Sequence, residues 1–364
     1  MSRLNILKSI YRNILFDCLV KKRSNTSVED AESGLQSFLH KEPPSFVQTN
    51  NINPQYDVMI VVPVYNVEKY LEQCIHSILT QETNYTYQAV FIDDGSTDGS
   101  YEILKRCLFP PHVYIFTKNQ GVAAARNTAL RDITGRYVMF LDSDDYLSPN
   151  AIEQLVNVAD ENSADIVEGG HVFFDVKGIS EVNTHGDTIH KISHQNLYGF
   201  PWGKMIRSNL LKTFCFPQGY LFEDTVMATL LHPSAKIIMS VPTVVYYYRD
   251  NQSGITHNSR ARKEAIDTFW IMKYCLEERL HRGQVLGQVD YDRYLVAVWR
   301  NWIRTKALPD DVQEWIFVLT CDLFCENLKF AYEGKQRKKS MLEKAIKNKS
   351  YQAYRFVLER WDIL

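Results

Sequence analysis

The chain has 364 residues, of which 45% are hydrophobic and 23% charged, and its net charge is −2. This composition is typical of a globular protein and excludes a largely disordered chain. Basic residues gather at both ends: residues 1–23 hold six Lys and Arg against one Asp, and residues 335–364 hold nine against three acidic residues. A nucleic-acid-binding protein carries its basic stripe on the folded domain, so we expect no nucleic acid as a partner. Basic ends suit a peripheral contact with an anionic membrane surface.

The cysteines and the apolar runs indicate the compartment. The seven cysteines include no CxxC pair, which is typical of reduced thiols in the cytosol. No apolar run approaches the ~20 residues that cross a bilayer. The N-terminus also lacks the continuous apolar segment of a signal peptide. We therefore expect a cytoplasmic protein that can lie peripherally on the inner face of the cell membrane.

The first 56 residues are predicted to form an amphipathic helix and a polar linker. Residues 4–22 carry an apolar stripe at helical spacing that includes Tyr11, Ile14 and Cys18. Such a basic amphipathic helix suits a membrane interface, although it could equally pack on its own protein or pair with a second copy. The linker contains Pro and Asn breakers, with one short helix near residues 35–39.

A different pattern begins at residue 57, where short apolar segments alternate with amphipathic ones. Strands followed by helices at this spacing predict βαβ units and a parallel sheet. In such sheets ligands bind beyond the carboxyl ends of the strands, so we expect the functional site there. The predicted strands are 57–63, 87–92, 112–116 and 136–141, and the predicted helices are 67–80, 97–107 and 121–131.

The rest of the chain is predicted to be mixed and then helical. After a helix that follows Pro149, the pattern changes more often and is helical from about residue 260 onward. The predicted elements in between are strands at 165–174 and 236–249, a surface hairpin at 176–193, and helices at 195–214 and 223–231. The predicted organisation is an N-terminal segment 1–56, an α/β domain 57–258 and a helical C-terminal domain 259–364.

Acidic residues follow the second and the fourth predicted strand. Asp93 and Asp94 come after one, and Asp142, Asp144 and Asp145 come after the other. Five carboxylates at one rim of a sheet repel each other unless a cation compensates them. Alternate residues such as Asp142 and Asp144 can both ligate one Mg²⁺ or Mn²⁺, which would neutralise a departing diphosphate. Taken alone, the same segment could be a solvated turn before the next helix.

Four sequence blocks lie at the predicted strand ends. They read PVYNVEKYLEQCIHSILTQ, IDDGSTDGS, KNQGVAAARNTAL and GRYVMFLDSDDYLSP, in this order. Their order and spacing resemble the family 2 glycosyltransferases of bacterial surface polysaccharide and glycoconjugate assembly, strongly over residues 57–150 and faintly over 196–258. The resemblance implies a GT-A fold, that is, a Rossmann-like and mostly parallel sheet flanked by helices. It also implies inverting transfer from a nucleotide sugar, with UDP-sugar as the favoured donor and Mn²⁺ or Mg²⁺ as cofactor.

The resemblance implies a role for each matching residue. Tyr65 would pack on the nucleobase, and Asp94 would accept a hydrogen bond from the N3–H group of the base. Asp142 and Asp144 would ligate the metal, with His257 as a third ligand or simply a surface histidine. The donor-binding residues implied in this way are Pro63, Tyr65, Asp94, Asn119, Arg126, Asp142 and Arg249. Arg126 would support the pocket or face the phosphates, and Arg249 would fold over the diphosphate.

Inverting transfer also requires a base that deprotonates the acceptor hydroxyl. Glu223 and Asp224 open an apolar helix, where the family carries its Glu-Asp pair. By that resemblance Asp224 is the base and Glu223 is its neighbour at the acceptor. Alternatively, both are ordinary acidic residues favoured by the helix dipole. Trp202 and Lys204, about 20 residues earlier, lie where the family places acceptor-side or loop residues, and Trp202 could stack on a sugar or pack in the core.

The expected function is therefore transfer of a sugar to a glycan or to a lipid-linked or protein-linked acceptor. A homo-oligomer is left open. One alternative is a non-catalytic nucleotide-sugar-binding subunit that partners an active glycosyltransferase. A nucleotidyltransferase is disfavoured, because the segment PVYNVEKY after the first strand lacks the Gly residues of a phosphate-binding loop.

Overall fold

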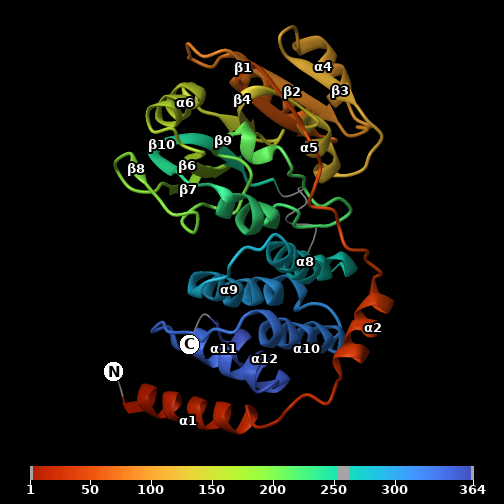
Figure 1. The fold of residues 1–364 in the computed structure, drawn as a ribbon, viewed down its shortest axis with the longest axis vertical. Helices are drawn as coiled ribbons and strands as arrows, with labels where there is room; N and C mark the ends of the chain where they lie inside the picture. Colours follow the sequence, from red (N-terminus) through yellow and green to blue (C-terminus); the bar gives the residue numbers. More distant parts are fainter. Residues whose placement is uncertain (1–2, 252–261, 362–364) are drawn as a thin grey trace. The chain divides into compact units, whose positions relative to one another are not determined.

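The structure is a computed structural model that describes the backbone of residues 3–251 and 262–361 (Figure 1). The chain divides into two compact units. One is an α/β unit of residues 44–257, and the other is a helical unit that combines residues 1–43 with residues 258–364. The two ends of the sequence therefore build one helical unit together.

The sequence predicts domain boundaries after residues 56 and 258, and the two units of the structure divide at other positions. Residues 44–56 belong to the α/β unit, which ends at residue 257. The first strand of the sheet starts within that segment. Just before the strand, buried Asn50 donates hydrogen bonds to the carbonyl groups of Leu211 (2.6 Å) and Phe214 (2.9 Å). The polar composition that suggests a linker thus provides side chains that fasten this segment to the unit.

The α/β unit is built on a ten-stranded sheet in the order β3-β2-β1-β4-β9-β6-β10-β5, with β7 beside β6 and β8 beside β10. Strands β3, β2, β1 and β4 run parallel, as do β6 and β10. Helices flank the sheet (Figure 1), which confirms the predicted α/β class with a mostly parallel sheet. The strands are β1 (Asn51–Val64), β2 (Tyr87–Asp93), β3 (Val113–Phe116), β4 (Asp132–Phe140), β5 (Tyr146–Leu147), β6 (Ile166–Asp175), β7 (Gly178–Asn183), β8 (His190–Lys191), β9 (Lys204–Arg207) and β10 (Ile238–Arg249).

The prediction of a helix over residues 195–214 is wrong. The segment is irregular as far as residue 203 and continues as β9 and a 3₁₀ turn, η1 (Ser208–Leu211). Pro201 lacks the N–H that a helix interior needs, and Gly203 has a φ of +72°, which no helix contains. Strand β9 instead runs antiparallel between β4 and β6 and joins the two parallel groups.

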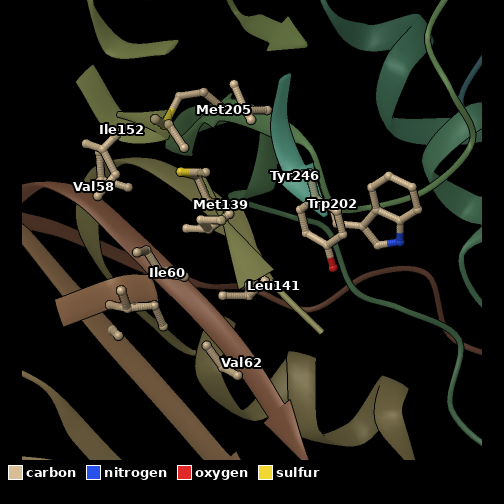
Figure 2. Close-up of a cluster of buried hydrophobic side chains, with 14 of the residues drawn as sticks. Val58, Ile60, Val62, Met139, Leu141, Ile152, Trp202, Met205 and Tyr246 are labelled. Atoms are coloured by element: carbon tan, nitrogen blue, oxygen red, sulfur yellow. The ribbon is translucent and has the colours of Figure 1, made fainter. Parts of the chain in front are cut away.

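The core of the α/β unit lies between the sheet and its helices. Alternate residues of a strand share one face, so Val58, Ile60 and Val62 of β1 point together toward Met139 and Leu141 (Figure 2). Apolar residues of α3 and α6 complete this cluster. The helices of the unit are α3 (Glu68–Leu79), α4 (Ser100–Cys107), α5 (Val122–Leu130) and α6 (Ala151–Glu161), followed by the π-helical η2 (Met227–Leu231) and η3 (His232–Ser234).

The helical unit shows where the N-terminal helix packs. Phe16 of α1 meets Phe356 of α12 with ring centroids 6.2 Å apart, and Asp17 pairs with Lys344 of α11. Tyr11 and Ile14, from the predicted apolar stripe, are 68% and 59% exposed. No helix in the described part of the chain is long and apolar enough to cross a membrane. The helices are α1 (Arg3–Leu19), α2 (Val28–Phe38), η4 (Lys263–Ile266), α8 (Asp267–His281), α9 (Gln288–Thr305), α10 (Asp310–Asn327), α11 (Arg337–Lys347) and α12 (Tyr351–Leu358).

Candidate active site

The loops after β1 and β2 are joined by hydrogen bonds. Asn66 accepts the main-chain N–H of Thr97 (2.7 Å), and its own N–H donates to the hydroxyl of Ser96 (3.1 Å). Pro63 is buried within β1, whereas Tyr65 is 51% exposed. The exposed ring of Tyr65 is therefore accessible to a planar ligand, whereas Pro63 is covered by the protein.

Asp94 fixes the loop that follows β3. Its two carboxylate oxygens accept the main-chain N–H groups of Gln120 (2.9 Å) and Gly121 (2.7 Å), and the residue is 3% exposed. A Cβ at Gly95 would lie 2.9 Å from the main-chain nitrogen of Asn119, so only glycine lets these loops approach so closely. The side chain of Asn119 is exposed. The second and third sequence blocks thus form one rigid surface.

Asp93, next to it, was expected at the acidic rim but is fully buried. One of its oxygens accepts the N–H of Ser96 (2.8 Å). The other is fully buried and has no hydrogen-bond partner within the described ranges. Buried polar atoms are normally paired. This oxygen therefore marks a point where a ligand donor or an ordered water would be stabilised.

Arg126 on α5 connects two parts of the predicted site. Its guanidinium donates to Asp142 after β4 (2.8 Å) and to Glu223 (2.7 Å), and the side chain is 5% exposed. It also lies over the ring of Phe216 at 5.2 Å. Burial alone would lower the pKa of Arg126, but the charges of Asp142 and Glu223 outweigh burial and raise it. Of the two predicted roles, this geometry favours support of the pocket.

The three acidic residues after β4 have different surroundings. Asp142 is partly exposed. Burial raises the pKa of Asp144, which accepts a hydrogen bond from Asn251 (2.9 Å), and the charge of Asp142 raises it further. Asp145 is 1% exposed and accepts the hydroxyl of Tyr246 (2.6 Å), so it stabilises the loop rather than facing a ligand. Burial raises the pKa of Asp145 well above its ordinary value.

Arg249, at the end of β10, is held beside the same loop. Its Nε donates to the carbonyl of Asp144 (2.8 Å), and a terminal nitrogen donates to Gln73 of α3 (2.6 Å). The guanidinium lies 4.6 Å from the ring centres of both Tyr70 and Phe174. Such contacts orient a cation without neutralising it. Arg249 therefore brings a fixed positive charge to the acidic rim.

The predicted metal site is only partly within the described residues. Across residues 3–251 and 262–361, no group of three or more His, Cys, Asp or Glu is placed to hold a metal ion. His257 lies outside the described residues. Asp142 and Asp144 form an oxygen-ligand pair of the kind that holds Mg²⁺ or Mn²⁺ together with substrate phosphates. The raised pKa of Asp144 fits this pair, because a bound cation would stabilise its charged form.

Asp224 lies at the start of a short helix and is partly exposed. The preceding Phe222 has a φ of +62°, a left-handed conformation that is rare for an aromatic residue and typical of functional segments. Burial raises the pKa of Glu223, against the opposing charge of Arg126. Glu223 forms an ion pair with Arg126, so the helix dipole alone does not explain why an acidic residue lies at this position.

Trp202 is packed on both faces. It stacks on Phe200 (4.5 Å between centroids) and on Tyr246 (4.4 Å), and it is 3% exposed (Figure 2). Of the two predicted roles, the geometry favours packing. Lys204, which the resemblance placed among acceptor-side or loop residues, forms a buried ion pair from β9 with Glu168 on β6. No local pattern in the sequence indicates Glu168 as its partner.

Comparisons with known proteins find a family and several relatives. Residues 59–215 match the model of "Glycosyl transferase family 2". "Glycosyltransferase GlyA" of Streptococcus pneumoniae is 32% identical over 273 residues, which cover 68% of this chain and 37% of that protein. "Poly(ribitol-phosphate) beta-N-acetylglucosaminyltransferase TarS" of Staphylococcus aureus is 25% identical over 281 residues, which cover 71% of this chain and 48% of that protein. The chain thus spans less than half the length of these two relatives.

A solved structure shares the fold. The crystal structure of residues 1–349 of Staphylococcus aureus TarS in complex with UDP-GlcNAc superimposes with a TM-score of 0.67 at 21% identity. The match covers 84% of this chain and 91% of the TarS chain.

Proposed function

Since the chain belongs to glycosyl transferase family 2, we propose that it transfers a sugar from a nucleotide-diphosphate sugar to a glycan acceptor. The observation that carries this proposal is the position of Arg126. One buried guanidinium holds Asp142 of the acidic rim and Glu223 beside Asp224. A displacement reaction needs its leaving group and its base in fixed relation, and this cation provides a rigid link between the two.

The proposed donor is a UDP-sugar. Tyr65 would stack on the uracil ring, while Pro63 and Asn119 line the base and ribose side. One oxygen of Asp94 accepts both the N–H of Gln120 and the hydroxyl of Thr117 (3.3 Å), whereas the other accepts only the N–H of Gly121 among the described residues. A carboxylate oxygen has two lone pairs, so this second oxygen could also accept the N3–H of uracil. A family relative with this fold has been crystallised with UDP-GlcNAc, which supports the uridine donor.

The proposed cofactor is Mn²⁺ or Mg²⁺, held by Asp142 and Asp144, with His257 as the further predicted ligand. When bound, such an ion neutralises the charge of the departing diphosphate. Arg249 would add a second positive charge on the same side. Arg126 would keep Asp142 oriented toward the ion.

Asp224 is the proposed base. It would take the proton of the acceptor hydroxyl while the acceptor oxygen bonds to the anomeric carbon from the face opposite the diphosphate. The bond between that carbon and the diphosphate oxygen breaks, its electron pair stays with UDP, and the configuration inverts. Glu223 would orient the acceptor but is less suited as the base, because its carboxylate is bound to Arg126.

Asp224→Asn tests this assignment against the alternative of a non-catalytic binding subunit. We would measure UDP release from a panel of UDP-sugars with Mn²⁺, together with the Kd of UDP by calorimetry. We expect the variant to bind UDP like the wild type and to lose most of its turnover, because removal of a general base costs about 10²–10⁴-fold. Equal UDP release by both proteins would remove Asp224 as the base. Binding without turnover in the wild type would favour the binding subunit.

The proposed setting is the assembly of a surface glycan, on a glycan, lipid-linked or protein-linked acceptor, with peripheral membrane contact through the basic ends. The basic residues of α11 and the exposed Tyr11 and Ile14 of α1 support this contact. Lys338→Glu combined with Lys339→Glu should weaken the binding of the protein to phosphatidylglycerol vesicles. Unchanged partition of the variant would contradict membrane contact without affecting the proposed reaction.

A further inference from the structure

A buried ion pair lies beside the residues proposed for catalysis. Lys204 on β9 and Glu168 on β6 are opposite each other in the antiparallel ladder, and their side chains meet at 2.5 Å. Both side chains are 1% exposed. A buried ion pair is often no more stabilising than apolar residues of the same size, because both charges lose their hydration. Its presence therefore requires an explanation beyond stability.

Both members of the pair also bind one loop, residues 197–203. Glu168 accepts the main-chain N–H of Tyr198 (3.2 Å), and Lys204 donates to the carbonyl groups of Phe200 (2.8 Å) and Trp202 (3.3 Å). The loop is irregular, so its main-chain groups need such partners. The ion pair thus holds the loop near its start and near its end.

The loop in turn contacts the acidic rim and comes close to the helix that follows Asp224. Its Trp202 stacks on Tyr246, whose hydroxyl donates to Asp145 and accepts the main-chain N–H of Asp142 (3.2 Å). On the other side, a Cβ at Gly199 would lie 3.9 Å from the Cβ of Ala228, in the helix that starts after Asp224.

Electrostatics support the same proximity. Burial lowers the pKa of Lys204, and the charges of Glu168 and Asp224 both oppose this. Asp224 is therefore close enough for its charge to act on Lys204. Burial also lowers the pKa of the neighbouring His171 to about 4, so His171 adds no competing charge at neutral pH.

We propose that the Lys204–Glu168 pair is a positioning device, which holds the loop 197–203 against the helix of Asp224 and so keeps that carboxylate in place relative to the acidic rim. The inference rests on the proposed role of Asp224 as the base. Lys204 and Glu168 are positioning residues, since they act through the loop and through Asp224. The pair should therefore affect turnover more than nucleotide affinity, because Tyr65, Asp94 and Asn119, the residues proposed to bind the base, lie in other loops.

The test uses the full chain with both charges of the pair removed together, Glu168→Gln with Lys204→Met, so that neither is left buried without the other; the glutamine keeps an oxygen beside His185, which also contacts Glu168. A matched control removes another buried pair, Arg279 and Asp290 of the helical unit, as Arg279→Met with Asp290→Asn. Lys204→Arg keeps the charge and serves as the conservative variant. For each protein we would measure the Kd of UDP with Mn²⁺, and kcat and KM for UDP release from whichever UDP-sugar the wild type uses.

We expect the Glu168→Gln, Lys204→Met protein to keep its Kd for UDP within about twofold and to lose about 10- to 100-fold in kcat, as small misplacements of a reacting group do. Lys204→Arg should recover part of kcat, and the Arg279, Asp290 control should match the wild type. Wild-type kcat in the double variant would overturn the inference, and so would equal losses in the double variant and the control. If Asp224→Asn itself keeps wild-type turnover, or if the wild type turns over no UDP-sugar, the proposed function fails first.

Discussion

The proposed donor side and the proposed base side of the site are held by different kinds of contact. On the donor side, Asp94 binds main-chain N–H groups of the loop after β3, and a glycine allows the two loops to touch. On the base side, charged side chains hold one another, as Arg126 holds Asp142 and Glu223. Main-chain contacts depend on backbone conformation, whereas buried charges depend on each partner remaining present. Substitutions should therefore affect the two sides through different observables.

Removal of the shared cation should have the largest effect. In Arg126→Met, the carboxylates of Asp142 and Glu223 would lose their common partner, and breaking a buried ion pair in this way costs about 3–5 kcal/mol. We expect the free energy of unfolding to fall by this order, measured by urea denaturation with circular dichroism. Arg126→Lys keeps the positive charge but not the planar guanidinium. We expect its free energy of unfolding to lie between those of the wild type and Arg126→Met. Equal stability of the Met variant and the wild type would contradict the assigned contacts.

Loss of the proposed metal ligand should show in ligand binding instead of in the free protein. A ligand at 100 times its Kd stabilises a native protein by about 2.7 kcal/mol. UDP with Mn²⁺ should therefore raise the Tm of the wild type, and Asp144→Ala should lose this increase. Glu102→Ala on α4 removes an exposed acidic residue and serves as the control. An unchanged increase in the Asp144 variant would remove Asp144 from the proposed metal site.

A backbone change should break the donor side. Gly95 has a φ of +75°, and a Cβ there would approach the main-chain nitrogen of Asn119 to 2.9 Å. We expect Gly95→Ala to cost about 1–3 kcal/mol in stability and to weaken UDP binding, measured by calorimetry. Gly283→Ala is a matched control, because its φ is +69° and an added Cβ meets nothing within 4 Å. If both variants bind UDP equally well, close loop contact is not what shapes the donor side.

The smallest expected effect is on pH dependence. Burial lowers the pKa of His171 to about 4, below the ordinary value of 6.5. The unfolded chain therefore binds more protons between these values, so the folded state loses stability as pH falls from 6.5 toward 4. His171→Phe has no titratable group at this position, so it should lose about 1–2 kcal/mol less stability than the wild type over this pH range. Urea denaturation at pH 7 and pH 4.5 measures the difference, and identical pH dependence in both proteins would contradict it.

The parallel half of the sheet is the part that the sequence predicts best. The buried parts of β2 (residues 89–92) and of β4 (residues 137–140) are continuous apolar runs, and this short-range pattern is visible without knowledge of the partner strand. The prediction starts β1 six residues late, because the segment with Pro54 resembles a breaker. In the structure this segment pairs with β4 across a register shift between Ile52 and Tyr56. A bulge of this kind depends on the partner strand and is not visible in the local sequence.

The second half of the unit was harder to predict for a physical reason. Strand β9 has only four residues, and its partners β4 and β6 lie far away in sequence. The resemblance pointed to Arg126 and Glu223 separately, but their contact joins residues 97 positions apart. Likewise, no local pattern pairs Lys204 with Glu168. Which buried charges meet is decided by the tertiary fold, and periodicity carries no information about it.

Asp145 lies far in sequence from its hydrogen-bond donors, and this separation matters while the chain is translated on the ribosome. Its two hydrogen-bond donors, the hydroxyl of Tyr246 and the main-chain N–H of Arg249, come 101 and 104 residues later in the chain. Synthesis proceeds at about 5–20 residues per second, so in the nascent chain this acidic segment lacks these two donors for roughly 5–20 seconds. The loops proposed to bind the nucleotide are thus translated first, and the acidic rim gains its hydrogen-bond donors only when β10 has emerged. A chain released before residue 246 would contain all four sequence blocks and still lack these donors.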